Sequence, residues 1–188
     1  ATMKLAQKDI NAAGGVLGKD IEITSADTSD ADHADQNTSS AQSVLAKNPS
    51  VVVGPPSSSV VKNTYKQVTS AKVPMISSGA TSTAFSGLSD YFFRTIPPDT
   101  VQGAVLGQII AQDGVKNLAI AVFNDEYGTS LRDVVVKTVE DAGVNVVYGE
   151  KDTFDPAETN FSSMVTAIKA TNPDATLVIA FDQTKPLL

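Results

Sequence analysis

Short hydrophobic runs alternate with segments of helical periodicity along most of the sequence, and this alternation limits the possible folds more than any other feature. Between the runs, apolar residues recur at the three- and four-residue spacing of one helix face. Strands separated by helices of this length form parallel sheets with right-handed crossovers. The expected helices are 2–13, 30–47, 58–71, 100–112, 127–142 and 160–171, and the expected strands are 21–27, 51–53, 73–77, 91–95, 117–123, 144–149 and 175–181.

The best candidate for a boundary inside this pattern is the pair Pro97-Pro98. Neither proline can donate to a strand ladder, and both stiffen the chain. The sequence therefore predicts an α/β fold of two doubly wound parallel-sheet lobes, residues 1–95 and 96–188. One continuous sheet with an ordinary proline loop is the alternative that periodicity leaves open.

Two local features sharpen the prediction for the first lobe. The run Val51–Val53 is continuous and β-branched, which is typical of a strand buried on both faces. Asp30 precedes a polar helical segment and is the expected N-cap of that helix.

Composition excludes several classes of function. The net charge is −7 and the charged residues are scattered, so no basic face suits nucleic acid. The chain has no cysteine, and its acidic stretch from Asp27 to Asp35 lacks the spacing of a calcium loop. The one histidine, His33, lies in a polar helix start and is expected to face solvent, which argues against a Ser-His-Asp hydrolase. No metal, cofactor or nucleic acid is therefore expected.

Small polar residues follow the predicted strands, where open α/β sheets bind their ligands. The run "GPPSSS" places Ser58 and Ser59 at a helix start, where hydroxyls and unpaired N–H groups suit a carboxylate. In "SSGATS", Gly79 permits a positive φ and close approach of a ligand, and Thr81 supplies a donor and an acceptor. A helix cap and an ordinary turn are the alternatives.

Three further residues are candidates in the second half. Tyr127 opens a helix after Asp125, which can cap that helix while the ring lines a cleft; simple packing is the alternative. Asp182 follows the last strand and either pairs with an ammonium group or caps a following helix. An enzyme that uses Asp125 or Asp182 as acid or base is a weaker hypothesis.

The ordered set of motifs resembles the leucine/isoleucine/valine-binding protein family, the type I periplasmic binding proteins of branched-chain amino acid ABC transporters. The resemblance covers essentially the whole chain and rests on "INAAGGVLGKDIEI", "VVVGPPSSSVV", "KVPMISSGATS", "YFFRTIPPDTVQG", "NLAIAVFNDEYGTSL" and "VEDAGVNVV". It implies a non-enzymatic, extracytoplasmic solute-binding component of an importer. Two hinged lobes would close on an amino acid or a related small polar solute and present the closed form to a membrane permease. A sensory ectodomain of a receptor is the alternative.

The resemblance also implies roles for particular residues. Ser58, with Ser57 and Ser59 beside it, would grip the amino acid head group. Gly79, Ala80 and Thr81 would contact the α-amino and α-carboxylate groups. Tyr127 would cover the ligand from the second lobe, and Asp182 stands where the family often has an aromatic residue.

Departures from the family pattern imply an internal fragment. The family begins with a central strand that precedes this sequence, and its later second-lobe strands would follow it. The unpaired strands would be repaired by another segment or by a strand-swapped dimer, or the first lobe would be only partly ordered. The expected location is periplasmic or extracellular, with a lipid anchor through a missing N-terminus as one option.

Overall fold

A computed structural model describes residues 2–30, 33–88 and 91–187. The helices are α1 Thr2–Ala12, α2 Ala34–Leu45, α3 Ser58–Ser70, α4 Asp99–Gln112, α5 Glu126–Asp141, α6 Ser162–Ala170 and α7 Thr184–Leu187, with a 3-10 turn at Thr83–Phe85. The strands are β1 Val52–Val53, β2 Met75–Ser77, β3 Phe92–Arg94, β4 Asn117–Val122, β5 Asn145–Tyr148 and β6 Ala175–Ile179.

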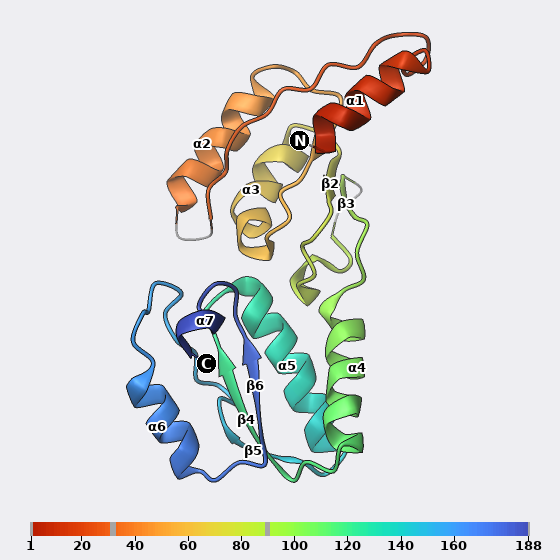
Figure 1. Cartoon of the computed structure of the whole chain (residues 1–188). Coiled ribbons are helices and arrows are strands. Elements are labelled where there is room, and N and C mark those ends of the chain that lie inside the picture. Colours follow the sequence, from red (N-terminus) through yellow and green to blue (C-terminus); the bar gives the residue numbers. More distant parts are fainter. Residues whose placement is uncertain (1, 31–32, 89–90, 188) are drawn as a thin grey trace.

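The described strands form two parallel sheets, ordered β1-β2-β3 and β5-β4-β6. Each sheet has its own hydrophobic core, and residues of one core do not enter the other. We call the elements from α1 to β3 lobe one and those from α4 to α7 lobe two; Figure 1 shows them stacked end to end. The predicted α/β fold with parallel sheets is confirmed.

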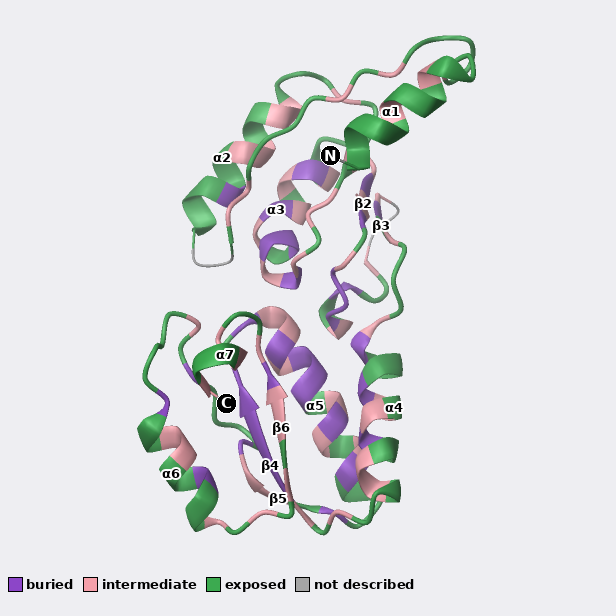
Figure 2. Cartoon of the chain, in the orientation of Figure 1, coloured by how far each residue is buried: buried purple, intermediate pink, exposed green. Residues whose placement is uncertain are grey.

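In lobe two, β4 is buried along almost its whole length because helices cover both faces of the sheet (Figure 2). Leu118, Ile120 and Val122 point to the face that packs against α5. Ala119 and Ala121 point to the other face, where Ile168 of α6 packs. The uninterrupted apolar run of β4 is therefore explained by burial on both sides.

Helices α4 and α5 approach each other very closely. A methyl group added at Gly103 would lie 2.7 Å from Val134 Cβ, and one at Gly107 would lie 2.7 Å from Thr138 Cβ. Such distances are far inside ordinary van der Waals contact, so a side chain at either position would push the helices apart. The two glycines therefore set the spacing of this helix pair.

In lobe one, helices α2 and α3 pack on one face of the sheet. Val52, Met75 and Phe92 are paired across the three strands and share a core with α2 and α3. On the opposite face, Val53 and Phe93 are 53% and 52% exposed. The prediction that Val51–Val53 is buried on both faces is wrong, because Val51 and Val53 are 42% and 53% exposed.

Two other local predictions for lobe one are also wrong. Residues 21–27 are extended but form no strand, since no described segment pairs with them; Ile21 is held instead by the side chains of Gln7 and Asn11. Asp30 does not cap α2, which begins at Ala34 with His33 as its N-cap residue. The Asp30 carboxylate lies 2.5 Å from His33 Nδ1 instead, and His33 is exposed as predicted.

Candidate functional site

The serines after β1 lie at the N-terminus of α3, as the sequence predicts, and each makes a different contact. Ser57 is the N-cap residue, and its hydroxyl accepts a hydrogen bond from the N–H of Val60. Ser58 is buried, and its Oγ accepts from the N–H of Ser82 at 3.2 Å. Ser59 turns away from this loop and donates to Asp125 Oδ2 at 2.5 Å. Capping therefore falls to Ser57, which leaves Ser58 against the second polar loop.

That second loop follows β2 and is folded against the end of β1. Ser77 Oγ donates to the carbonyl of Pro55 and accepts from the N–H of Ala80. Gly79 does not have a positive φ, contrary to the sequence-based expectation. Its Cα instead approaches Pro56 so closely that a Cβ would lie 2.7 Å from the Pro56 carbonyl oxygen. Glycine is required here by packing between the two loops.

Arg94 fixes the path of the same loop from β3. Its Nη1 donates to the carbonyls of Ala80, Thr81 and Ser82, the last at 2.8 Å. These three bonds hold the loop backbone toward β3, while the N–H of Ser82 donates to Ser58 of the other loop. The two serine- and threonine-bearing loops are thus brought side by side, as the parallel sheet predicts.

The start of lobe two brings an acidic side chain to Thr81. The N–H of Asp99, the first residue of α4, donates to the Thr81 carbonyl at 2.8 Å. Asp99 is 0% exposed, yet among the described residues neither of its carboxylate oxygens has a hydrogen-bond partner, and nor does Thr81 Oγ1. Buried polar groups are nearly always paired. Three polar atoms of these two residues are therefore buried without a partner among the described residues.

Tyr127 lies near this acidic residue. Burial raises the pKa of its hydroxyl, a hydrogen bond from the Gln102 side chain opposes the rise, and the negative charges of Asp99 and Asp125 add to it. The ring stacks on Phe181, with centroids 5.7 Å apart and planes inclined by 3°. Tyr127 therefore combines an aromatic wall with a hydroxyl near the unpaired carboxylate.

The structure brings most of the predicted residues together but leaves Asp182 apart. The Asp182 side chain is 95% exposed and pairs with Lys185 at 3.2 Å. Asp125, which was the other acid of the enzyme hypothesis, caps α5 through Oδ1 to the Tyr127 N–H and accepts from Ser59 through Oδ2. Neither aspartate has the free, partly buried carboxylate that acid–base chemistry would need.

Sequence reasoning missed Asp99 and Phe181. Asp99 directly follows Pro97-Pro98 at a helix start, and an acid at that point of the crossover was the available signal. Phe181 follows the last strand. It therefore places an aromatic ring one residue before Asp182, the predicted site residue. Both could have been found by asking which side chains the crossover and the strand end place beside Thr81 and Tyr127.

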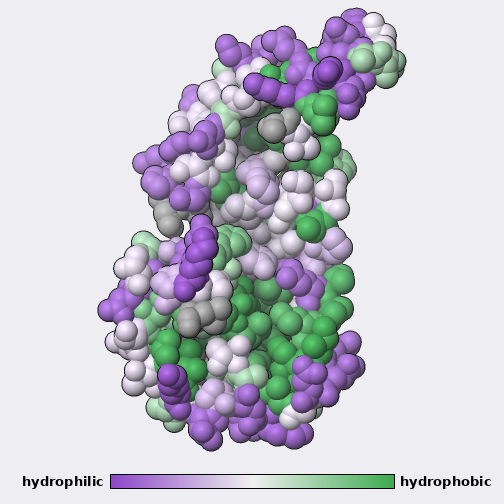
Figure 3. Space-filling view, in the orientation of Figure 1, coloured by the Kyte–Doolittle hydropathy of each residue, from purple (hydrophilic) through white to green (hydrophobic). Residues whose placement is uncertain are grey.

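Two cavities lie beside these residues. A polar one of about 290 Å³ lies between the lobes and is lined by Ser59, Lys62, Asn63, Asn124, Asp125, Glu126 and Thr129. An apolar one of about 460 Å³ runs from Thr81 along α4 and is lined by Ile96, Pro97, Val101, Gln102, Val105, Leu106 and Ile109. Figure 3 shows apolar side chains gathered on this face of lobe two.

In the described parts of the chain, no group of acidic or histidine side chains could hold a metal ion, and no helix has the length and hydropathy to cross a bilayer.

The sequence profile described as periplasmic binding protein matches residues 1–187. The chain belongs to the periplasmic binding protein family. This family consists of binding proteins, so the expectation that the chain is not an enzyme is confirmed. Its type I architecture and the resemblance to the leucine/isoleucine/valine-binding proteins are confirmed as well.

Curated relatives in the family are similar over most of this chain. The leucine-, isoleucine-, valine-, threonine- and alanine-binding protein of Pseudomonas aeruginosa is 33% identical over 168 residues, which are 88% of this chain and 44% of that protein. Leu/Ile/Val-binding protein homolog 1 of Brucella abortus is 33% identical over 172 residues, 86% of this chain and 43% of the relative. The chain thus spans less than half the length of these relatives.

Solved structures of the family share the fold. The substrate-binding protein LivJ of Streptococcus pneumoniae, in complex with isoleucine, is 27% identical with a TM-score of 0.79 over 93% of this chain and 49% of its own. The leucine-binding protein LivK of Thermotoga maritima has a TM-score of 0.85 at 18% identity, over 94% of this chain and 49% of its own. The second likeness concerns the fold alone.

Proposed function

We propose that this chain forms part of an extracytoplasmic solute-binding protein of an ABC importer, and that its solute is an amino acid held where the two lobes meet. The observation that carries the proposal is the unpaired, buried trio of Asp99 Oδ1, Asp99 Oδ2 and Thr81 Oγ1. An ammonium group offers three donors and a positive charge, which is the complement of two carboxylate oxygens and a hydroxyl.

The carboxylate of the same solute has a site one residue away. Ser58 contacts Ser82, the neighbour of Thr81, and stands at the first turn of α3. The first N–H groups of a helix lack intrahelical partners and attract negative charge. A zwitterion placed here would set its carboxylate toward Ser58 and α3, and its ammonium toward Thr81 and Asp99.

The side chain of the solute would lie toward lobe two. The stacked rings of Tyr127 and Phe181 offer an apolar surface, and the cavity beside Thr81 is lined mainly by aliphatic side chains of α4. An apolar amino acid suits both. The name of the Pseudomonas aeruginosa relative, a leucine-, isoleucine-, valine-, threonine- and alanine-binding protein, supports this class.

In this proposal Ser57 and Ser59 act indirectly. Ser57 caps α3, and Ser59 holds Asp125, so both position the helix termini around the solute. Gly79 and Ala80 shape the loop that carries Thr81. The proposed division between lobes is residue 95/96, a membrane permease is the proposed partner, and the proposed location is outside the cytoplasm.

The test is a calorimetric titration with leucine and with 4-methylpentanoate, which is leucine without its amino group. Micromolar binding corresponds to about 8 kcal/mol. We expect heat of binding with leucine and none with the deamino acid, and we expect Asp99→Asn to lose leucine binding. Equal binding of both compounds by the folded protein would contradict an ammonium site at Asp99.

A further inference from the structure

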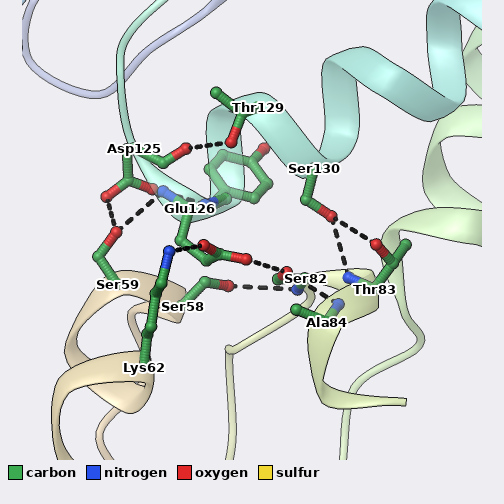
Figure 4. Close-up of polar contacts among 11 residues, drawn as sticks. Ser58, Ser59, Lys62, Ser82, Thr83, Ala84, Asp125, Glu126, Thr129 and Ser130 are labelled. Atoms are coloured by element: carbon green, nitrogen blue, oxygen red, sulfur yellow. Dashed lines mark hydrogen bonds and ion pairs between the residues drawn. The ribbon is translucent and has the colours of Figure 1, made fainter.

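Two helix N-termini from different lobes meet head to head beside the proposed solute site. Helix α3 begins at Ser58 in lobe one and α5 begins at Glu126 in lobe two, and the two helices are in contact. Each N-terminus carries a partial positive charge, so bringing them together is unfavourable unless negative charge lies between them. Figure 4 shows two acidic side chains, Asp125 and Glu126, in that position.

Asp125 joins the two helix starts through one hydroxyl. Its Oδ2 accepts from Ser59 Oγ at 2.5 Å, and the same Oγ accepts from the N–H of Glu126 at 2.9 Å. The other oxygen, Oδ1, accepts from the N–H of Tyr127 at 2.7 Å. The N-cap of a lobe-two helix is thereby built partly from a lobe-one side chain.

Glu126 makes a second crossing from lobe two to lobe one. Its Oε1 accepts from Ser82 Oγ at 2.8 Å, and its Oε2 lies 2.7 Å from Lys62 Nζ (Figure 4). The glutamate side chain is only 15% exposed, whereas the lysine is 64% exposed. The contact to Ser82 is therefore the stronger of the two, because water screens the exposed ion pair.

A third contact between the lobes involves no charged group. The N–H of Thr83 donates to Ser130 Oγ at 2.9 Å. All three interlobe contacts use atoms of the protein alone, so none of them needs a bound solute. Thr81, whose side-chain oxygen is unpaired among the described residues, directly precedes Ser82 of the second contact.

We propose that Asp125 and Glu126 form an interlobe bridge, with Ser59, Lys62 and Ser82, that holds the lobes closed before any solute binds. The bridge neutralises two converging helix N-termini, and its two carboxylates act as positioning residues. It sets the fraction of ligand-free protein that is closed, and a solute then binds a form that is already populated. The proposal shares with the proposed function the movement of two lobes and the contact of Ser59 with Asp125.

The absence of cysteine makes the bridge directly measurable. Lys66 of α3 and Ala167 of α6 are exposed and lie outside the bridge. With spin labels on Lys66→Cys and Ala167→Cys, pulsed electron–electron double resonance measures the distribution of distances between the lobes in the full chain without solute. We expect a main population at the short separation of the closed form.

Glu126→Gln and Asp125→Asn remove one charge each while keeping side chains of the same shape. Asparagine remains a good N-cap, so Asp125→Asn spares α5. Hydrogen bonds to charged groups are strong enough that each change should lower the closed-to-open ratio by about tenfold. Glu140→Gln, an exposed change at the far end of α5, is the matched control and should leave the distribution unchanged.

Circular dichroism and thermal melting establish that each variant is folded, and Ser59→Ala is a second route to the same result if one acidic variant does not fold. Separation distributions that are identical in the parent and in the folded bridge variants would overturn the proposal, as would a parent that is mainly open. Because no solute enters this measurement, a protein that binds no amino acid would contradict the proposed function and leave the bridge result intact.

Discussion

The ring of Tyr127 lies parallel to the ring of Phe181, with 5.7 Å between centroids and 3° between planes. The stack connects the first turn of α5 with the segment just after β6, and both rings also contact Phe123. Phe181 remains 58% exposed. An aromatic ring held flat but open to solvent is suited to receive an apolar group on its free face.

Removing the ring of Phe181 should weaken solute binding more than it lowers the stability of the fold. For Phe181→Ala we expect a loss of about 1 kcal/mol in the free energy of unfolding, since aromatic pairs contribute roughly 0.5–1.5 kcal/mol beyond their buried area. Leucine affinity should fall by about tenfold or more. Urea unfolding and calorimetry measure the two effects. Phe181→Leu keeps much of the apolar surface without the stack, and an affinity equal to that of the parent in both variants would remove Phe181 from the site.

The Asp99 carboxylate should lower the free energy of unfolding in the absence of solute. A buried carboxylate without a partner is unfavourable, while a charge at a helix N-terminus is favourable by a smaller amount. Asp99→Asn should therefore raise the free energy of unfolding by about 1 kcal/mol and abolish leucine binding. Thermal melting with and without leucine tests both effects. Asp113→Asn, exposed at the other end of α4, should change neither.

Gly79→Ala should destabilise lobe one. The added methyl group would meet the Pro56 carbonyl at 2.7 Å and Pro56 Cβ at 2.9 Å, and a backbone atom cannot easily move away. Overpacking of this kind costs about 1–3 kcal/mol. Denaturant unfolding measures the loss, and Ser78→Ala at the exposed neighbouring position is the control. Equal stability of the two variants would show that the loops separate easily.

Asp174 should make lobe two sensitive to acid. Its carboxylate accepts hydrogen bonds from the N–H groups of Asn117 and Lys116 at the start of β4, and these bonds lower its pKa below the usual 3.8. A lowered folded-state pKa contributes stability that is present above the unfolded pKa and is lost as pH falls through the folded pKa. The stability advantage of the parent over Asp174→Asn should therefore be constant near neutral pH and shrink below about pH 4. Parallel melts across pH measure it, and an advantage that does not change with pH would argue against the two bonds.

Strand β1 lies at one edge of the lobe-one sheet, and this edge should lead two copies of the chain to associate. Val51 and Val53 are exposed, and residues 21–27 lie extended without a described strand partner. An unpaired apolar strand edge is a template for another strand. We expect a strand-swapped or partly ordered species, seen as a concentration-dependent dimer by light scattering, and Val53→Lys should reduce it. A monodisperse monomer with one cooperative melt would count against this prediction.

The sequence predicts the elements of this fold well wherever a local cause decides them. Helical periodicity and caps place α3 and α5 within a residue or two, because the signal lies in neighbouring residues. Residues 21–27 show the limit, since alternation describes a face but a strand also needs a partner. Val53 shows a second limit, because a β-branched run reports preference for a strand and not what covers each side.

The candidate site divides in the same way. Ser58 and Thr81 could be predicted because the carboxyl ends of parallel strands must meet at one edge. Asp99 was not predicted, because an acid at a helix start suggests a cap, and only the path of the crossover places it beside Thr81. The contact of Ser59 with Asp125 joins residues 66 positions apart. No local pattern records which of the three adjacent serines contacts the second polar loop, which caps the helix and which contacts the other lobe.

The close approach of α4 and α5 at Gly103 and Gly107 has a mechanical consequence. With no room for even a methyl group between them, we expect the two helices to move as one rigid unit. One of them begins at Asp99 and the other begins just after Asp125. A displacement at the start of α4 would therefore also displace the start of α5.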